Sequence, residues 1–150
     1  MELIAIFKNQ VLGISLVAWL LAQVVKIPIE FFQTKKWNWA LLLAAGGMPS
    51  SHSALITSIV FSIGLWTGFD SALFALSFAM AMVIIYDATG IRRQAGIHAS
   101  VINRMIEDLA AGHPLKGEEM REILGHTPIE AIAGVGLGLV VALVGWLILV

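Results

Sequence analysis

Residues 131–150, AIAGVGLGLVVALVGWLILV, form a stretch without a single charged side chain. About 20 mainly apolar residues make a helix that crosses the roughly 30 Å hydrocarbon core of a bilayer. Directly before the stretch, Thr127, Pro128 and Glu130 stand where an N-cap, a first helical residue and a capping-box acid belong. The sequence therefore predicts a membrane-spanning helix over 128–150.

Charge-free stretches also occupy residues 9–25, 37–69 and 71–86. Hydrophobic residues make up 59% of the 150 residues and charged residues 13%, whereas soluble domains have roughly 45–50% and 25%. The alternating strands of a membrane β-barrel do not occur in the sequence. We therefore expect a single all-α domain over 1–150, an integral membrane helical bundle.

About four transmembrane helices are predicted, at residues 11–32, 50–66, 71–88 and 128–150, with a kink at Pro28. Gly134 and Gly138 form a small-xxx-small pair that is typical of close helix packing. The apolar residues 37–48 are too few to span, which indicates a short re-entrant or interfacial segment.

The charged region between the third and fourth spans contains apolar residues at helical spacing: Val101, Ile102, Met105, Ile106 and Leu109. This pattern predicts an amphipathic surface helix that ends at residues 112–114, with its apolar face on the bundle or on the membrane surface. A shorter charged helix is expected at 118–124.

Four spans place the end of the first, the start of the second, the end of the third and the start of the fourth on one face. This face carries eight basic residues: Lys26, Lys35, Lys36, Arg92, Arg93, Arg104, Lys116 and Arg121. The opposite face carries one basic residue, Lys8. Basic residues gather on the cytoplasmic side of membrane proteins. We therefore expect this face in the cytoplasm, in a protein of the inner or cell membrane.

The remaining composition excludes several classes of function. A net charge of −1 argues against a nucleic-acid partner, which would need clustered and uncompensated basic residues. Without cysteine there is no disulfide, thiol nucleophile or cysteine lipid anchor.

The first candidate site is PSSHS at residues 49–53, where the second span begins. Hydroxyls and unpaired backbone N–H groups at a helix N-terminus bind anions, and His52 is placed to donate a proton to a bound anion. The alternative is ordinary N-capping by Ser50 or Ser51, with His52 at the interface.

The second candidate is GHTPIE at residues 125–130. His126 and Glu130 are four residues apart, so the carboxylate can hold the imidazole N–H while the other ring nitrogen acts as a nucleophile or base. A capping box accounts for Thr127 and Glu130 but not for His126. The two roles of Glu130 are compatible.

The third candidate is YDATGIRR at residues 86–93, at the end of the third span. Arg92 and Arg93 serve either as topology anchors or as a fork for phosphate oxygens, and Asp87 is a partner for one of them. The histidines form no HxxxH or HExxH pattern, so we expect neither a metal ion nor another cofactor.

These motifs together resemble the type 2 phosphatidic acid phosphatases, whose superfamily includes the vanadium haloperoxidases. PSSH at 49–52 is similar to Pro-Ser-Gly-His, and residues 125–134 are similar to Gly-x-His-x-Pro-x-Asp-x-x-Ala-Gly. With the YDATGIRR segment, the whole chain resembles the divergent bacterial and plant branch. Its four spans would match the four core helices of the six-helix lipid phosphatases.

The resemblance implies a metal-independent hydrolase of phospholipid or polyprenyl phosphates, acting through a phosphohistidine. His126 would attack phosphorus, Glu130 would orient it in place of the family's Asp, and His52 would protonate the leaving oxygen. The implied phosphate ligands are Lys26, Ser50, Ser51, Arg92 and Arg93. The implied partners are the lipid phosphate and membrane lipids, with self-association left open.

The sequence departs from the family pattern at two phosphate ligands. No Arg-Pro follows Lys26, and Met120 stands where the arginine six residues before His126 is expected, with Arg121 one position out of register. The alternatives are therefore a phospholipid-binding or transport protein that retains the anion pocket, and a structural bundle whose polar residues are caps and anchors.

Overall fold

The computed structural model describes residues 3–43, 46–110 and 127–150. Its described part is helical and contains no strand, which confirms the all-α prediction. The elements in chain order are α1 (Leu3–Ile6), α2 (Gln10–Thr34), the 3-10 helix η1 (Trp39–Leu42), α3 (Ser51–Thr67), α4 (Ala72–Thr89), α5 (Ile91–Ala110) and α6 (Pro128–Leu149).

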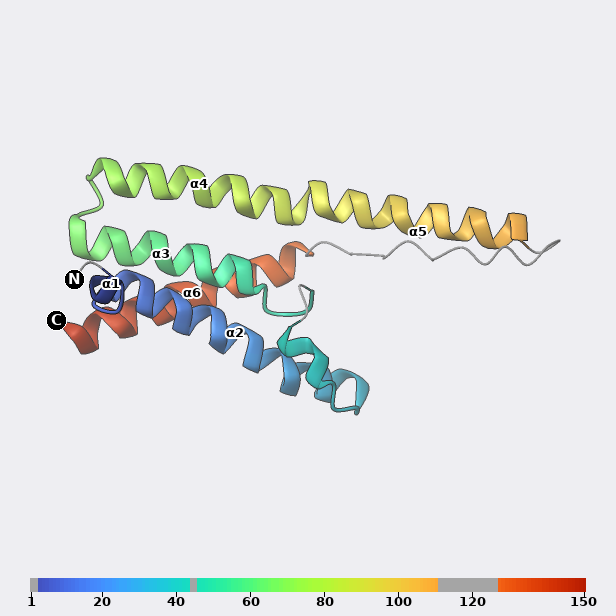
Figure 1. Cartoon of the computed structure of the whole chain (residues 1–150), viewed down its shortest axis with the longest axis horizontal. Coiled ribbons are helices and arrows are strands. Elements are labelled where there is room, and N and C mark those ends of the chain that lie inside the picture. Colours follow the sequence, from blue (N-terminus) through green and yellow to red (C-terminus); the bar gives the residue numbers. More distant parts are fainter. Residues whose placement is uncertain (1–2, 44–45, 111–126) are drawn as a thin grey trace.

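Four of these helices form the bundle, and α3 lies among the other three (Figure 1). Within the described residues, α2, α4 and α6 are long and apolar enough to cross a membrane. The predicted second span, α3, is apolar but has only 17 residues. It is about 26 Å long, slightly less than the roughly 30 Å bilayer core.

Each bundle helix begins with a side-chain cap. Asn9, Ser50, Ser71 and Thr127 accept hydrogen bonds from backbone N–H groups in the first turns of α2, α3, α4 and α6. An unpaired N–H group is costly in an apolar medium, so the caps stabilise the helix starts. The helix α2 continues through Pro28, the predicted kink, without ending there.

Gly134 and Gly138 bring α6 against α3, as the small-residue spacing predicts. A Cβ atom added at Gly134 would collide with the carbonyl oxygen of Ser50, and one at Gly138 with that of Ala54. Both glycines are buried. Their lack of a side chain therefore sets how closely the two backbones approach.

The segment before α3 begins at the surface, with residues 37–40 exposed. Trp37 stacks on Phe31 with ring centroids 4.5 Å apart, and on Trp39 with centroids 5.9 Å apart. Trp37 and Trp39 are both exposed, and η1 packs against the end of α2. Exposed tryptophans are typical of the membrane–water interface. The geometry fits the interfacial alternative better than a re-entrant segment.

The predicted amphipathic helix is α5, which begins directly after Gly90 and continues in nearly the same line as α4 beyond the bundle (Figure 1). The described helices leave its apolar residues exposed, including Val101, Met105 and Leu109. A helix that continues along the axis of a spanning helix points away from the bundle, so this placement differs from the predicted one, flat on the bundle or on the membrane surface. The predicted helix end at 112–114 and the charged helix at 118–124 lie outside the described residues.

Replacing Gly138 by Ala should destabilise the bundle, because the added methyl group would collide with the α3 backbone. Unlike the flexible end of a side chain, the backbone cannot move aside easily. Overpacking of this kind costs about 1–3 kcal/mol. Gly136→Ala is the matched control, since a Cβ atom there meets nothing within 4 Å. Thermal unfolding in detergent should show a lower Tm for Gly138→Ala alone, and equal Tm values for the two variants would contradict this packing.

Candidate functional site

The start of α3 presents three buried serines with different hydrogen bonding. Ser50 caps the helix: its Oγ accepts from the backbone N–H of Ser53 at 3.3 Å and from the Ser53 hydroxyl at 3.1 Å. Ser51 is equally buried, but its Oγ has no hydrogen-bond partner among the described residues. Capping therefore accounts for Ser50, whereas Ser51 is left to bind something else.

The start of α6 lies directly beside the start of α3. The backbone N–H of Ser50 donates to the carbonyl oxygen of Glu130 at 2.9 Å. The predicted capping box is present: Thr127 N–H donates to Glu130 Oε2 at 2.9 Å, and Glu130 N–H donates to Thr127 Oγ1 at 3.4 Å. Capping uses one carboxylate oxygen, and a carboxylate has about four acceptor positions. A second role for Glu130 is thus compatible with the cap.

Lys26 is the third element of the site, and it comes from α2. Its side chain is only 1% exposed, and the negative charge of Glu130 acts on it. Gly47 packs against the aliphatic part of the Lys26 side chain. A Cβ atom added at Gly47 would lie 3.5 Å from Lys26 Cδ. A charge inside a membrane protein needs a partner and marks a functional site by default.

A polar pocket of about 250 Å³ adjoins these groups. It lies between the end of α2, the segment before α3 and the start of α6, and its polar lining comprises Lys26, Glu30, Gln33, Thr127 and Glu130. The pocket therefore combines one buried cation with acids at a membrane face. Among the described residues, no three His, Asp or Glu side chains gather as a metal site would require.

Buried polar side chains also occur within α2 and α3. Ser51, Ser58 and Ser62 share one face of α3 by their spacing, and Gln23 lies one turn before Lys26 in α2. The side-chain oxygens of all four have no partner among the described residues. Sequence reasoning missed Gln23, although a polar residue inside the charge-free stretch 9–25 is itself a signal of function.

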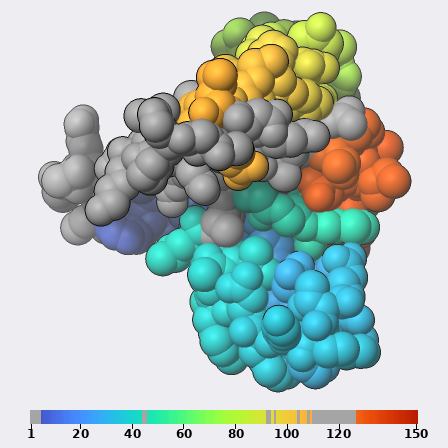
Figure 2. Space-filling view, turned by 90° about the vertical axis from the view of Figure 1, so that its right-hand side faces the viewer, coloured from blue at the N-terminus to red at the C-terminus, as the bar shows by residue number. Residues whose placement is uncertain are grey.

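The other predicted site residues divide into those the structure describes and those it does not. His52 is exposed, in the first turn of α3. The backbone of Arg92 and Arg93 lies at the start of α5, while their side chains, and all of Arg121 and His126, fall outside the described part. Figure 2 views this end of the molecule, with the α3 start (teal) between the α2–η1 lobe (blue to cyan) and the α6 start (orange-red).

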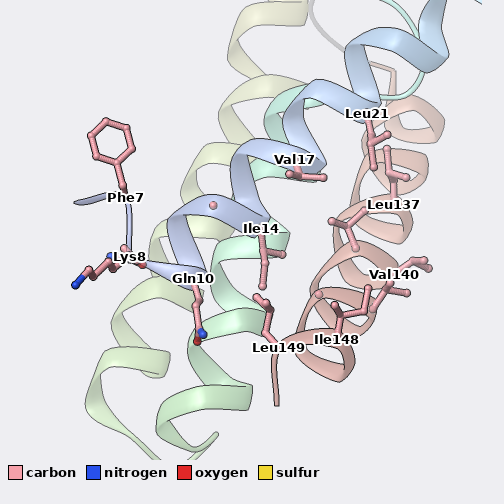
Figure 3. A pocket seen from close by; sticks show the side chains of 15 residues that line it. Phe7, Lys8, Gln10, Ile14, Val17, Leu21, Leu137, Val140, Ile148 and Leu149 are labelled. Atoms are coloured by element: carbon pink, nitrogen blue, oxygen red, sulfur yellow. The ribbon is translucent and has the colours of Figure 1, made fainter. Parts of the chain in front are cut away.

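A second, larger pocket of about 770 Å³ lies at the opposite end of the bundle. Its walls are apolar residues of α2, such as Ile14 and Val17, facing Leu137 and Val140 of α6 (Figure 3). The polar side chains of its lining are Lys8, Asn9 and Gln10, all at the start of α2. None of the predicted motifs reaches this pocket, so it is not the candidate site.

The end of the bundle with Lys26, Ser51 and the α3 N-terminus is suited to binding an anion. The lysine supplies positive charge, the serine supplies a hydroxyl without a partner among the described side chains, and the helix start supplies oriented N–H groups. Glu130 beside them can orient a base or compensate the lysine when the anion is absent.

Comparison with known proteins agrees with the motifs. Residues 7–141 match the family described as "Divergent PAP2 family". The chain is also 41% identical over 141 residues to a protein of Bacillus subtilis (strain 168) named "Uncharacterized membrane protein YuiD", covering 87% of this chain and 89% of that protein. No solved structure matches the chain.

The charges of Lys26 and Glu130 should be energetically coupled. Glu130→Gln should lower the free energy of unfolding by about 1–3 kcal/mol, because it leaves a buried ammonium group without its compensating charge. Adding Lys26→Met should restore part of the loss, and a double-mutant cycle in detergent measures the coupling. Glu30→Gln, which changes another acid of the same pocket, should couple more weakly. Additive effects of Lys26→Met and Glu130→Gln would disprove the pairing.

Proposed function

Because this chain belongs to the divergent PAP2 family, we propose that it is a membrane lipid-phosphate phosphatase acting through a phosphohistidine. The observation that carries the proposal is the convergence of Lys26, the α3 N-terminus and Glu130 at one membrane face. His126, the proposed nucleophile, directly precedes the Thr127 cap in the sequence.

The proposed reaction proceeds in two steps. In the first, an imidazole nitrogen of His126 attacks phosphorus, the bond from phosphorus to the leaving oxygen breaks, and His52 gives that oxygen a proton. In the second, water gives a proton to His52 and attacks phosphorus, the bond from phosphorus to His126 breaks, and inorganic phosphate leaves with both histidines restored. Glu130 orients the imidazole and stabilises its positive charge. No metal ion or other cofactor takes part.

The phosphate oxygens would be held by groups that the bundle prepares in advance. Ser51 offers a buried hydroxyl without a partner in the described part, and Lys26 offers a buried positive charge. Ser50 contributes mainly by fixing the α3 start, since its Oγ serves as the cap. Donors that need no rearrangement stabilise the charge that develops in phosphoryl transfer.

Arg92 and Arg93 are proposed to complete the phosphate site in place of the family's missing arginines. Both follow within four residues of Thr89, where α4 ends at the same membrane face. Arginine binds two phosphate oxygens at once, which lysine does not. A protein that binds lipid phosphate without hydrolysing it is the alternative, because Met120 replaces one conserved cation of the family pattern.

Purified protein in detergent should release inorganic phosphate from at least one member of a panel of phosphatidic acid, phosphatidylglycerophosphate and polyprenyl mono- and diphosphates. Release should persist with a metal chelator. His126→Ala should abolish it, and Glu130→Gln should lower kcat at least about tenfold, because a neutral amide stabilises an imidazolium less well. Glu107→Gln, on the exposed surface of α5, is the matched control.

The results separate the alternatives. Saturable lipid binding without phosphate release from any member of the panel would favour the binding protein. Unchanged kcat in Glu130→Gln would restrict Glu130 to its capping role.

The proposed site faces the cytoplasm, according to the distribution of basic residues. A Cys in place of Lys36 should react with an impermeant thiol reagent only after cells are permeabilised, whereas a Cys in place of Lys8 should react in intact cells. Both lysines are exposed, and the chain has no native cysteine. The opposite pattern of labelling would place the site outside.

A further inference from the structure

A crevice of about 400 Å³ runs between α4 and α6. The residues that characterise this α4–α6 crevice are Thr57, Phe61, Phe78, Met82, Tyr86 and Val135. The helix α3 packs extensively against both α4 and α6, whereas α4 and α6 barely touch one another. Most of the lining belongs to α4, the rest of it to α3, and Val135 borders the crevice on the α6 side.

The crevice opens sideways, toward the surroundings of the bundle. Val60 and Ala81 at its base are buried, while Phe78, Met82 and Tyr86 along its wall are 48%, 62% and 73% exposed. In a membrane this open side faces lipid chains. A hydrocarbon tail can consequently enter it from the bilayer without passing through water.

One end of the crevice lies close to the proposed phosphate site on each of its three helices. Thr57 is five residues after His52, Val135 is five after Glu130, and Thr89 is three before Arg92. Five helical residues correspond to about 7–8 Å along the axis. The polar lining residues Tyr86 and Thr89 are also at this end, where a lipid headgroup would join its tail.

Aromatic rings line the other end of the crevice. Phe61 and Phe78 line it, and they are linked through Phe69 and Phe74 with ring centroids 6.4, 5.1 and 6.0 Å apart in succession. From Thr89 to Phe78 the crevice extends about 16 Å along α4. One leaflet of a bilayer core is about 15 Å thick, so the crevice is as deep as one leaflet.

We infer that the α4–α6 crevice holds an acyl tail of the lipid whose phosphate binds beside Lys26 and Ser51. This inference rests on the proposed function and specifies its substrate as a diacyl lipid phosphate that enters laterally. A tail one leaflet long fills the crevice from Thr89 to the aromatic rings of Phe61 and Phe78, whereas a longer polyprenyl tail would extend beyond the lining. The larger groove between α2 and α6 (Figure 3) begins at the opposite membrane face and is the competing position.

Photo-crosslinking tests the inference without requiring turnover. The full chain in liposomes is irradiated with phosphatidic acid that carries a diazirine near the end of one 16-carbon tail. Mass spectrometry should find the label on Phe61, Phe78 or Met82, and excess unlabelled phosphatidic acid should remove it. Label on Ile14, Val17 or Leu137, no specific label, or stronger competition by polyprenyl phosphate would each overturn the assignment.

A substitution that fills the crevice gives the second test. Val135→Trp should lower the ratio of kcat/KM for dihexadecanoyl to dihexanoyl phosphatidic acid at least tenfold, because only the long tail needs the occupied space. Val83→Trp makes the same change on the outer side of α4, outside the crevice, and should keep the wild-type ratio. An unchanged ratio in a folded Val135→Trp protein would also overturn the inference.

The two tests distinguish failure of the inference from failure of the proposed function. If the wild-type protein binds but does not hydrolyse phosphatidic acid, the position of the crosslink alone decides whether the crevice holds the tail. If it hydrolyses the lipid while the label lies in the α2–α6 groove, the function stands and the assignment of the crevice falls.

Discussion

The close contact between α3 and α6 is the constraint on which the rest of the structure depends. Gly134 and Gly138 carry no side chain, so the backbone of α6 reaches the carbonyl oxygens of Ser50 and Ala54. At this spacing the Ser50 N–H group meets the Glu130 carbonyl, and the starts of the two helices are held together. In a bilayer, where apolar surface gains little by leaving lipid, such close packing is a main source of helix association.

This contact brings together the starts of α3 and α6, which are far apart in the sequence, and both lie beside Lys26 of α2. Lys26 from α2 shares a pocket with Glu130 at the α6 start, and the negative charge of Glu130 acts on it. A buried ammonium group would be strongly unfavourable in the membrane without that acid. The capping box holds Glu130 at this position. One carboxylate therefore both stabilises the start of α6 and acts electrostatically on Lys26.

The separation of polar and apolar cavities follows the geometry of the membrane. The polar pocket lies where α2 ends and α3 and α6 begin, at the face that would meet water and lipid headgroups. The α4–α6 crevice extends from that face into the apolar interior, and the α2–α6 groove lies at the other end. A lipid phosphate likewise has a polar headgroup at one end and an apolar tail at the other. The arrangement of the cavities therefore suits a molecule held in the membrane better than a soluble one.

The sequence by itself determined the class of fold, the helix positions and the capping box, because apolar length, caps and small-residue spacing are local properties of the chain. It also indicated Lys26, Ser50, Ser51, His52 and Glu130 as members of one site, through a family resemblance and a count of spans. Only the tertiary structure decided that Ser50 is the cap, that the Ser51 hydroxyl and the Gln23 side-chain oxygen are buried without a partner in the described part of the chain, and that a crevice opens beside α4. Those features depend on the distances between helices, which are set by packing between residues remote in sequence and not by the pattern within any one helix.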